Sequence, residues 1–144
     1  MLGLTQNNPE YPNQLHDGIS ITGIINFSGP VAGLDIVEKI FSDSDIEIMS
    51  EIGRALFPLS EGYESKENIA VYEPITYFDQ NDPPIFLWHG GNDNQVPPKT
   101  FERFVPMLQP QKDVVMFLAE GQHSPNLEEL QNAYNTIFLF LDTL

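Results

Sequence analysis

Three short apolar segments alternate with amphipathic stretches along the chain. They run from Ile19 to Phe27, from Ile85 to His89 and from Lys112 to Leu118, and Pro, Gly or Asn residues lie beside them. Apolar runs of this length between turn residues predict buried β-strands. The middle run is continuously apolar, which is typical of a strand that is covered on both faces in a parallel sheet.

Helical spacing of apolar residues fills most of the chain between the first two predicted strands. It predicts helices over Val31 to Phe41 and Asp45 to Phe57, and a short third helix near residues 66–72. Residues 31–82 are far longer than a simple crossover needs, so we expect them to form a helical, lid-like insertion.

Two further helices are predicted after the second and third strands. The first follows Pro97 and carries Phe101 and Phe104, and Pro106 is expected to end it early. The second is expected to begin after Asn126, with Glu129 completing a capping box. Its predicted buried face is made of residues at helical spacing: Leu127, Leu130, Tyr134, Ile137, Leu141 and Leu144.

The alternation of strands and helices predicts the α/β class with a parallel sheet. The length of 144 residues fits a single domain, residues 1–144. Residues 7–18 are rich in Pro, Asn and Gly and are predicted to form a loop.

Charge and composition exclude several classes of partner. The net charge is -15, with 21 acidic and 6 basic residues, which argues against binding nucleic acid or an anionic membrane. No apolar run reaches the roughly 20 residues of a membrane span. There is no cysteine, and the three histidines lack metal-ligand spacing, so we expect neither a metal site nor a cofactor. The chain also lacks a glycine-rich phosphate loop.

Candidate chemistry lies in the turns that follow the second and third strands. The second strand leads into His89-Gly90-Gly91-Asn92-Asp93, and the third leads into Gly121-Gln122-His123. Together with Pro83-Pro84 before the second strand and Val96-Pro97 after Asp93, this pattern resembles the C-terminal half of α/β-hydrolases. The closest resemblance is to the esterase/lipase branch that includes acetyl-esterase-like and prolyl-oligopeptidase-like enzymes.

The resemblance implies a partial α/β-hydrolase fold, with the last three parallel strands, flanking helices and the insertion between the first two strands. It implies that Asp93 is the acid and His123 the base of a Ser-Asp-His triad. The carboxyl ends of neighbouring parallel strands are where such sheets place their sites.

The nucleophile of that triad is missing, since no Gly-x-Ser-x-Gly turn occurs in the chain. Ser20 runs into a strand rather than standing between a strand and a helix, so it does not fit the role. Ser28 and Ser124 fit turn and helix-start roles better. His89-Gly90-Gly91 resembles an oxyanion-hole motif, but we interpret its glycines as residues that let the strand end bend. We therefore expect the chain to be the C-terminal part of a longer enzyme.

Two functions follow as alternatives. In the first, the chain is part of a serine hydrolase that cleaves small carboxylic esters, with a related peptidase kept open. In the second, it is a catalytically silent remnant that acts as a binding or assembly module. An open sheet edge near Ile21–Phe27 would then recruit a second copy, which predicts a homo-oligomer.

Overall fold

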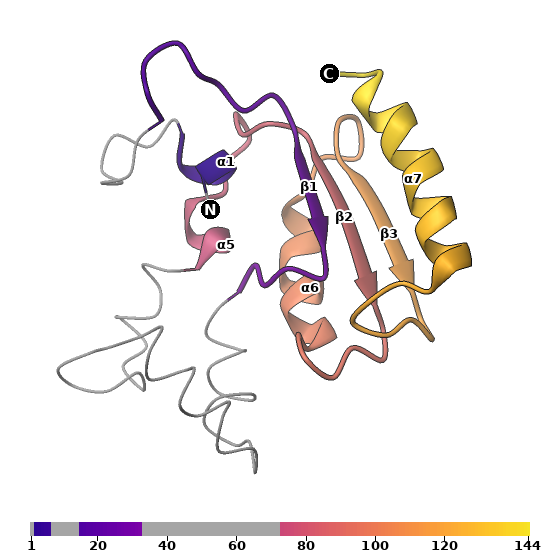
Figure 1. Ribbon diagram of the computed structural model, residues 1–144. Helices are drawn as coiled ribbons and strands as arrows, with labels where there is room; N and C mark the ends of the chain where they lie inside the picture. The colour runs from indigo at the N-terminus through magenta and orange to yellow at the C-terminus, as the bar shows by residue number, and fades with distance from the viewer. Residues whose placement is uncertain (1, 7–14, 33–72) are drawn as a thin grey trace, which may run out of the picture.

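The computed structural model describes residues 2–6, 15–32 and 73–144 (Figure 1). The helices predicted between Val31 and residue 72 lie outside these ranges, apart from Val31 and Ala32. The described end of the predicted insertion contains one short helix, α5 (Pro74–Tyr77).

The centre of the described part is a three-stranded parallel sheet. Its strands are β1 (Ile24–Phe27), β2 (Ile85–Gly90) and β3 (Val114–Leu118), in the spatial order β1-β2-β3. Ile24 lies opposite Ile85, and His89 lies opposite Phe117. Strands that run in the same direction require crossovers through other elements, and the crossover from β2 to β3 is visible beside the sheet in Figure 1. The predicted α/β class and the partial parallel sheet are confirmed.

Strand β1 is shorter than the prediction of Ile19 to Phe27, which was wrong for its first five residues. The backbone N–H of Ile24 donates to the Pro84 carbonyl at 2.9 Å, where the ladder starts. Proline has no N–H to donate, so Pro83 and Pro84 cannot extend the ladder backwards. Ile21 is instead held by the side chain of Gln6, whose amide donates to the Ile21 carbonyl at 3.0 Å and accepts from its N–H at 2.8 Å.

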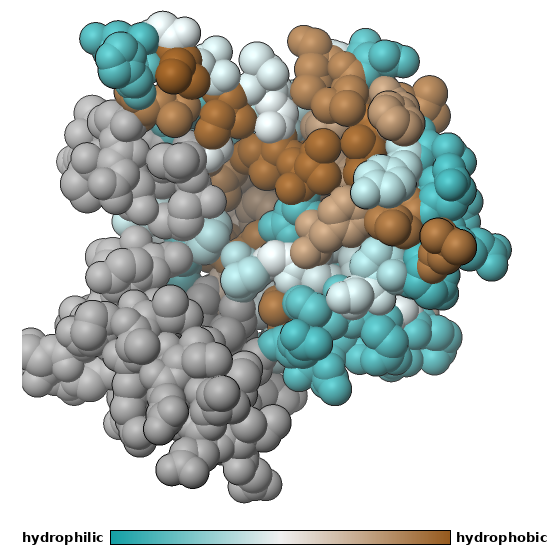
Figure 2. All heavy atoms as spheres, in the orientation of Figure 1, coloured by the Kyte–Doolittle hydropathy of each residue, from teal (hydrophilic) through white to brown (hydrophobic). Residues whose placement is uncertain are grey.

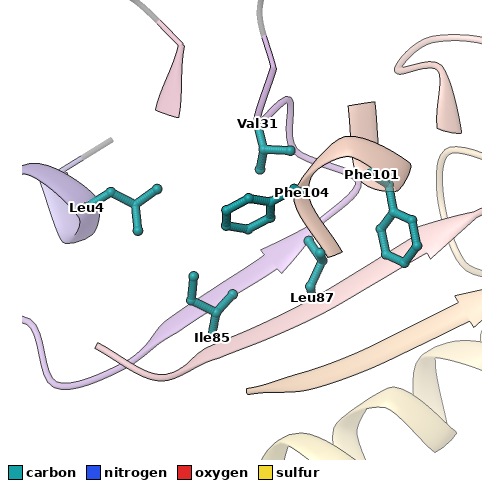
Figure 3. Close-up of a cluster of buried hydrophobic side chains, with 6 residues drawn as sticks. All are labelled: Leu4, Val31, Ile85, Leu87, Phe101 and Phe104. Atoms are coloured by element: carbon teal, nitrogen blue, oxygen red, sulfur yellow. The ribbon is translucent and has the colours of Figure 1, made fainter. Parts of the chain in front are cut away.

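Helices cover the two faces of β2, whose six residues are all buried. On one face, α6 (Pro98–Phe104) and α1 (Leu2–Thr5) contribute to a cluster around Ile85 and Leu87 (Figure 3). The cluster consists of Leu4, Val31, Ile85, Leu87, Phe101 and Phe104. As predicted, helix α6 ends before Pro106, and a 3-10 turn, η2 (Val105–Met107), follows it.

Helix α7 (Leu127–Leu141) packs on the opposite face, against Phe86 and Trp88. Its start is confirmed: the Asn126 side chain accepts from the N–H groups of Glu128 and Glu129, and the Glu129 carboxylate accepts from the Asn126 N–H. These bonds satisfy N–H groups that no residue inside the helix can reach.

The predicted buried face of α7 is confirmed at Ile137 but was wrong for Leu127, Tyr134, Leu141 and Leu144. The buried residues are Ala133, Ile137 and Phe140, whereas Leu127 is 83% exposed and Tyr134 and Leu141 are also exposed. The large rings of Phe86 and Trp88 fill the space beneath the helix, so a small residue such as Ala133 fits closest to the sheet. The prediction relied on the largest apolar residues of the helix and therefore missed Ala133, which lies at the centre of the buried face.

The surface separates into apolar and polar regions (Figure 2). Hydrophobic atoms gather in the part of the view where β1 and the start of the sheet lie, and hydrophilic atoms cover the end toward which the strands point. Ile25 of the edge strand β1 is 45% exposed, and Val115 of the opposite edge strand β3 is 39% exposed.

Candidate active site

The turns after β2 and β3 are in direct backbone contact at the carboxyl end of the sheet. The N–H of Gly91 donates to the Leu118 carbonyl and the N–H of Asn92 donates to the Gly121 carbonyl, both at 2.8 Å. A Cβ atom on Gly90 would overlap the Gln122 carbonyl oxygen and lie 2.5 Å from that of Gly121. Gly90 and Gly91 are therefore required because the two backbones approach closely, and not because of a positive φ, which neither of them has.

Asp93 lies in the first of these turns, buried, with both carboxylate oxygens engaged. Its Oδ1 accepts from the backbone N–H groups of Gln95 and Val96, each at 2.8 Å. This pattern is typical of aspartate in a turn, where the side chain bonds the backbone two and three residues ahead. It fixes the carboxylate so that Oδ2 points to the second turn.

His123 lies in the second turn and meets Asp93 there. Its Nδ1 is 2.9 Å from Asp93 Oδ2, and because a carboxylate only accepts, Nδ1 carries the proton and donates it. In the neutral imidazole, Nε2 is then the unprotonated nitrogen. None of the described residues hydrogen-bonds to Nε2, and the His123 side chain is 30% exposed. The structure thus brings together the two residues that the sequence singled out.

A second histidine, His89, lies beside this pair and was not predicted to belong to it. It is 1% exposed, and its Nε2 lies 3.1 Å from the Val96 carbonyl and 3.7 Å from Asp93 Oδ2. Burial lowers the pKa of His89, while the Val96 carbonyl and Asp93 act in the opposite direction. A polar residue at a core position of an apolar strand was the sequence signal for it, since such a group needs a buried partner.

The serines take different places. Ser28 directly follows β1, is buried, and has a φ of 48°, which non-glycine residues adopt rarely. Among the described residues its hydroxyl has no hydrogen-bond partner, so it is not bonded to His123. Ser20 is exposed and outside any strand or helix, and Ser124 is exposed just before α7.

The arrangement can accept and return a proton. A buried carboxylate that holds one nitrogen of an imidazole stabilises the imidazolium that forms when the other nitrogen takes a proton. Among the described residues, no group of three or more His, Asp or Glu side chains is arranged to hold a metal ion. No helix in the described ranges has the length and apolar character to cross a membrane.

A pocket lies apart from the two turns, on the α6 side of β1. It is lined mainly by apolar residues at the starts of the strands and on the flanking helices, and neither Asp93 nor His123 takes part. Its lining includes Leu4, Ile24, Asn26, Val31, Ile85 and Phe104.

Comparison with known proteins shows the family of the chain. The family model BD-FAE, an α/β-hydrolase-like esterase domain, matches residues 1–108. A solved structure described as "Bifunctional GH43-CE Bacteroides eggerthii" is similar in fold, with a TM-score of 0.64 and 22% sequence identity. That match covers 98% of this chain and 20% of the other, so the chain spans about a fifth of its length. A search of curated proteins found no match. The chain belongs to the BD-FAE family, and its fold and family are those of an esterase-type hydrolase.

Proposed function

We propose that the chain supplies the acid and the base of a Ser-Asp-His site that hydrolyses carboxylic esters. The observation that carries this proposal is the 2.9 Å hydrogen bond from His123 Nδ1 to the buried carboxylate of Asp93, which leaves His123 Nε2 as the unprotonated nitrogen. The match to an esterase family supports the hydrolysis of ester bonds rather than peptide bonds.

The reaction begins when a serine hydroxyl attacks the ester carbonyl while His123 Nε2 takes its proton. The Asp93 carboxylate stabilises the resulting imidazolium through Nδ1–H. The imidazolium then gives its proton to the leaving alcohol as the C–O bond breaks, which leaves an acyl-serine. Water hydrolyses that ester in a second cycle of the same proton transfers, releasing the acid and restoring the serine.

The serine of this site lies outside the chain under our proposal, since the chain has no Gly-x-Ser-x-Gly turn. Ser20, Ser28 and Ser124 lack the required strand–turn–helix setting or a bond to His123. The substrate is a small ester, and the proposal assigns no cofactor.

The test has two parts. The isolated chain is treated with p-nitrophenyl esters and a serine-directed fluorophosphonate, and we expect neither hydrolysis nor labelling. A labelled serine in the chain would overturn the view that the nucleophile lies outside it. In the longer protein that contains the serine, His123→Ala is expected to lower kcat by about three orders of magnitude or more.

Two variants sharpen the second part. Asp93→Asn keeps the size of the side chain but removes the charge, and we expect a loss of roughly two to four orders of magnitude in kcat. The matched control is His16→Ala, because His16 is exposed and its Nδ1 lies 2.8 Å from the carbonyl of the neighbouring Asp17, away from Asp93 and His123 in the sequence. A loss of less than tenfold for His123→Ala would remove His123 from the role of base.

A second candidate function, assembly of a silent module, is favoured by the edge strand β1. Among the described residues β1 pairs with β2 alone, and its Ile25 is 45% exposed. Unpaired edges of this kind recruit other strands. Light scattering would show a dimer or larger species that Ile25→Lys dissociates. Val115→Lys is the matched control, because it adds the same charge at a similarly exposed valine on the other edge strand. A monomeric wild-type chain would rule this function out.

A further inference from the structure

His89 occupies a core position of β2 although it is polar. It lies on the same face of the strand as Ile85 and Leu87, and its ring packs against Phe101 with a centroid separation of 5.4 Å. With 1% of its surface exposed, it has no access to water that would satisfy its nitrogens. Its hydrogen-bonding partners must therefore come from the protein.

The hydrogen-bond partner of His89 is a backbone carbonyl in the turn that carries Asp93. A carbonyl only accepts, so His89 Nε2 bears the proton and donates it to the Val96 carbonyl at 3.1 Å. The N–H of the same Val96 donates to Asp93 Oδ1 at 2.8 Å. Val96 is thus held through both of its backbone polar groups, one by His89 and one by Asp93. This closes the turn from residue 93 to residue 96 on the strand end.

The hydrogen bonds from the turn to Asp93 Oδ1 also orient the Asp93 carboxylate. With Oδ1 bound by the turn, Oδ2 is left for His123 Nδ1 at 2.9 Å. His89 Nε2 lies 3.7 Å from that oxygen, beyond hydrogen-bond distance. A protonated His89 would attract Asp93 Oδ2 away from His123 and would repel the imidazolium of His123. Burial lowers the pKa of His89, which keeps the ring neutral and prevents this competition.

We propose that His89 is a positioning residue: as a neutral imidazole protonated on Nε2, it anchors Val96 so that Asp93 holds His123 with its proton on Nδ1. Its importance for catalysis rests on the proposed function. Its effect on the Asp93–His123 pair is independent of the serine, so it is measurable in this chain.

The experiment measures the tautomer of His123 by NMR, from the correlations of its ring carbon-bound protons to the two ring nitrogens at pH 7.5. The wild-type chain is expected to show His123 protonated on Nδ1. His89→Leu removes the donor and retains an apolar side chain, so His123 should shift to a mixture of tautomers. His89→Gln places an amide donor near Val96 and should restore the wild-type spectrum.

Leu87→Ala is the matched control, because Leu87 is buried two residues earlier on the same face and belongs to the apolar cluster with Ile85, Phe101 and Phe104. It should lower stability but leave the His123 tautomer unchanged, which separates positioning from general destabilisation. If His89→Leu fails to fold, His89→Asn, whose amide is too short to reach Val96, is expected to give the same loss. An unchanged tautomer in the folded Leu or Asn variant would overturn the proposal.

The outcomes also separate this proposal from the proposed function. If the wild-type chain itself lacks the Nδ1 tautomer, the Asp93–His123 geometry is wrong, and both proposals fail. If the wild type shows it and His89→Leu retains it, only the role of His89 fails. In the longer, active protein, His89→Leu should lower kcat about 10- to 100-fold with little change in KM, and His89→Gln should recover most of it.

Discussion

Gly90 provides the most direct test of how the site is built. Its Cα lies against the loop of residues 119–122, and a Cβ atom there would overlap the Gln122 carbonyl oxygen and lie 2.5 Å from that of Gly121. Both neighbours are backbone atoms, which cannot rotate away as a side chain would. In the variant Gly90→Ala, the turns after β2 and β3 must therefore separate.

The cost can be worked out from the contacts that this separation breaks. Ordinary contacts of a Cβ begin near 3.4 Å, so the loop has to retreat by about 1 Å. Two 2.8 Å hydrogen bonds between the turns, Gly91 N–H to Leu118 and Asn92 N–H to Gly121, are lost or weakened at about 1 kcal/mol each. Overpacking adds about 1–3 kcal/mol, and the less flexible unfolded chain returns about 0.4–1 kcal/mol. We expect a net destabilisation of about 2–4 kcal/mol.

Urea unfolding followed by circular dichroism measures this loss. The control is Gly18→Asn: Gly18 has a φ of 85°, which asparagine tolerates, and among the described residues beyond its two chain neighbours no atom lies within 4 Å of an added Cβ. That variant should change the free energy of unfolding by less than about 1 kcal/mol. A similarly small loss for Gly90→Ala would refute the reasoning that the two turns are in tight backbone contact.

Three further predictions concern stability. Asp113→Ala should cost about 2–4 kcal/mol in urea unfolding, because the buried Asp113 carboxylate accepts from the N–H groups of Ile85 and Gln109. The control Asp17→Ala, at an exposed aspartate, should be nearly neutral. Asn126→Ala should cost about 1 kcal/mol and reduce helicity, since it removes the N-cap of α7, and an unchanged midpoint would contradict this. Because the pKa of His89 is lowered in the native chain, only the unfolded chain takes up a proton on this residue near pH 6.5. The free energy of unfolding therefore falls as the pH drops through that value. Between pH 7.5 and 5.5 the wild type should lose up to about 1.4 kcal/mol more than His89→Gln, and parallel losses would contradict the assignment.

The strands and the site residues were predictable because their signals are local. A continuous apolar run between prolines is enough to predict β2. The pairing of Asp93 with His123 was implied by the resemblance of the turns after β2 and β3 to those of α/β-hydrolases, and the two side chains do meet. The start of α7 was predictable for the same reason, since Asn126 and Glu129 bond each other's backbone within one turn.

What the sequence could not show depends on contacts between distant residues. The true length of β1 is limited by Pro83 and Pro84 on its neighbour, about sixty residues later in the chain. The buried face of α7 depends on the aromatic rings of β2 beneath it, which place Ala133 at the centre. The role of His89 depends on a carbonyl whose direction is fixed only once the turn has formed.

The backbone contact between the two turns also has a consequence for the order of folding. Asp93 and His123 are separated by only thirty residues: Asp93 follows β2, and His123 follows β3 of the same strand–helix–strand unit, β2, α6 and β3. Contacts of modest sequence separation form with a small loop-closure cost. The pair can therefore assemble together with β3 pairing to β2, before more distant parts of the chain dock. In hydrogen-exchange terms, the amides of Gly91 and Asn92 should open together with those of β3, as one cooperative unit.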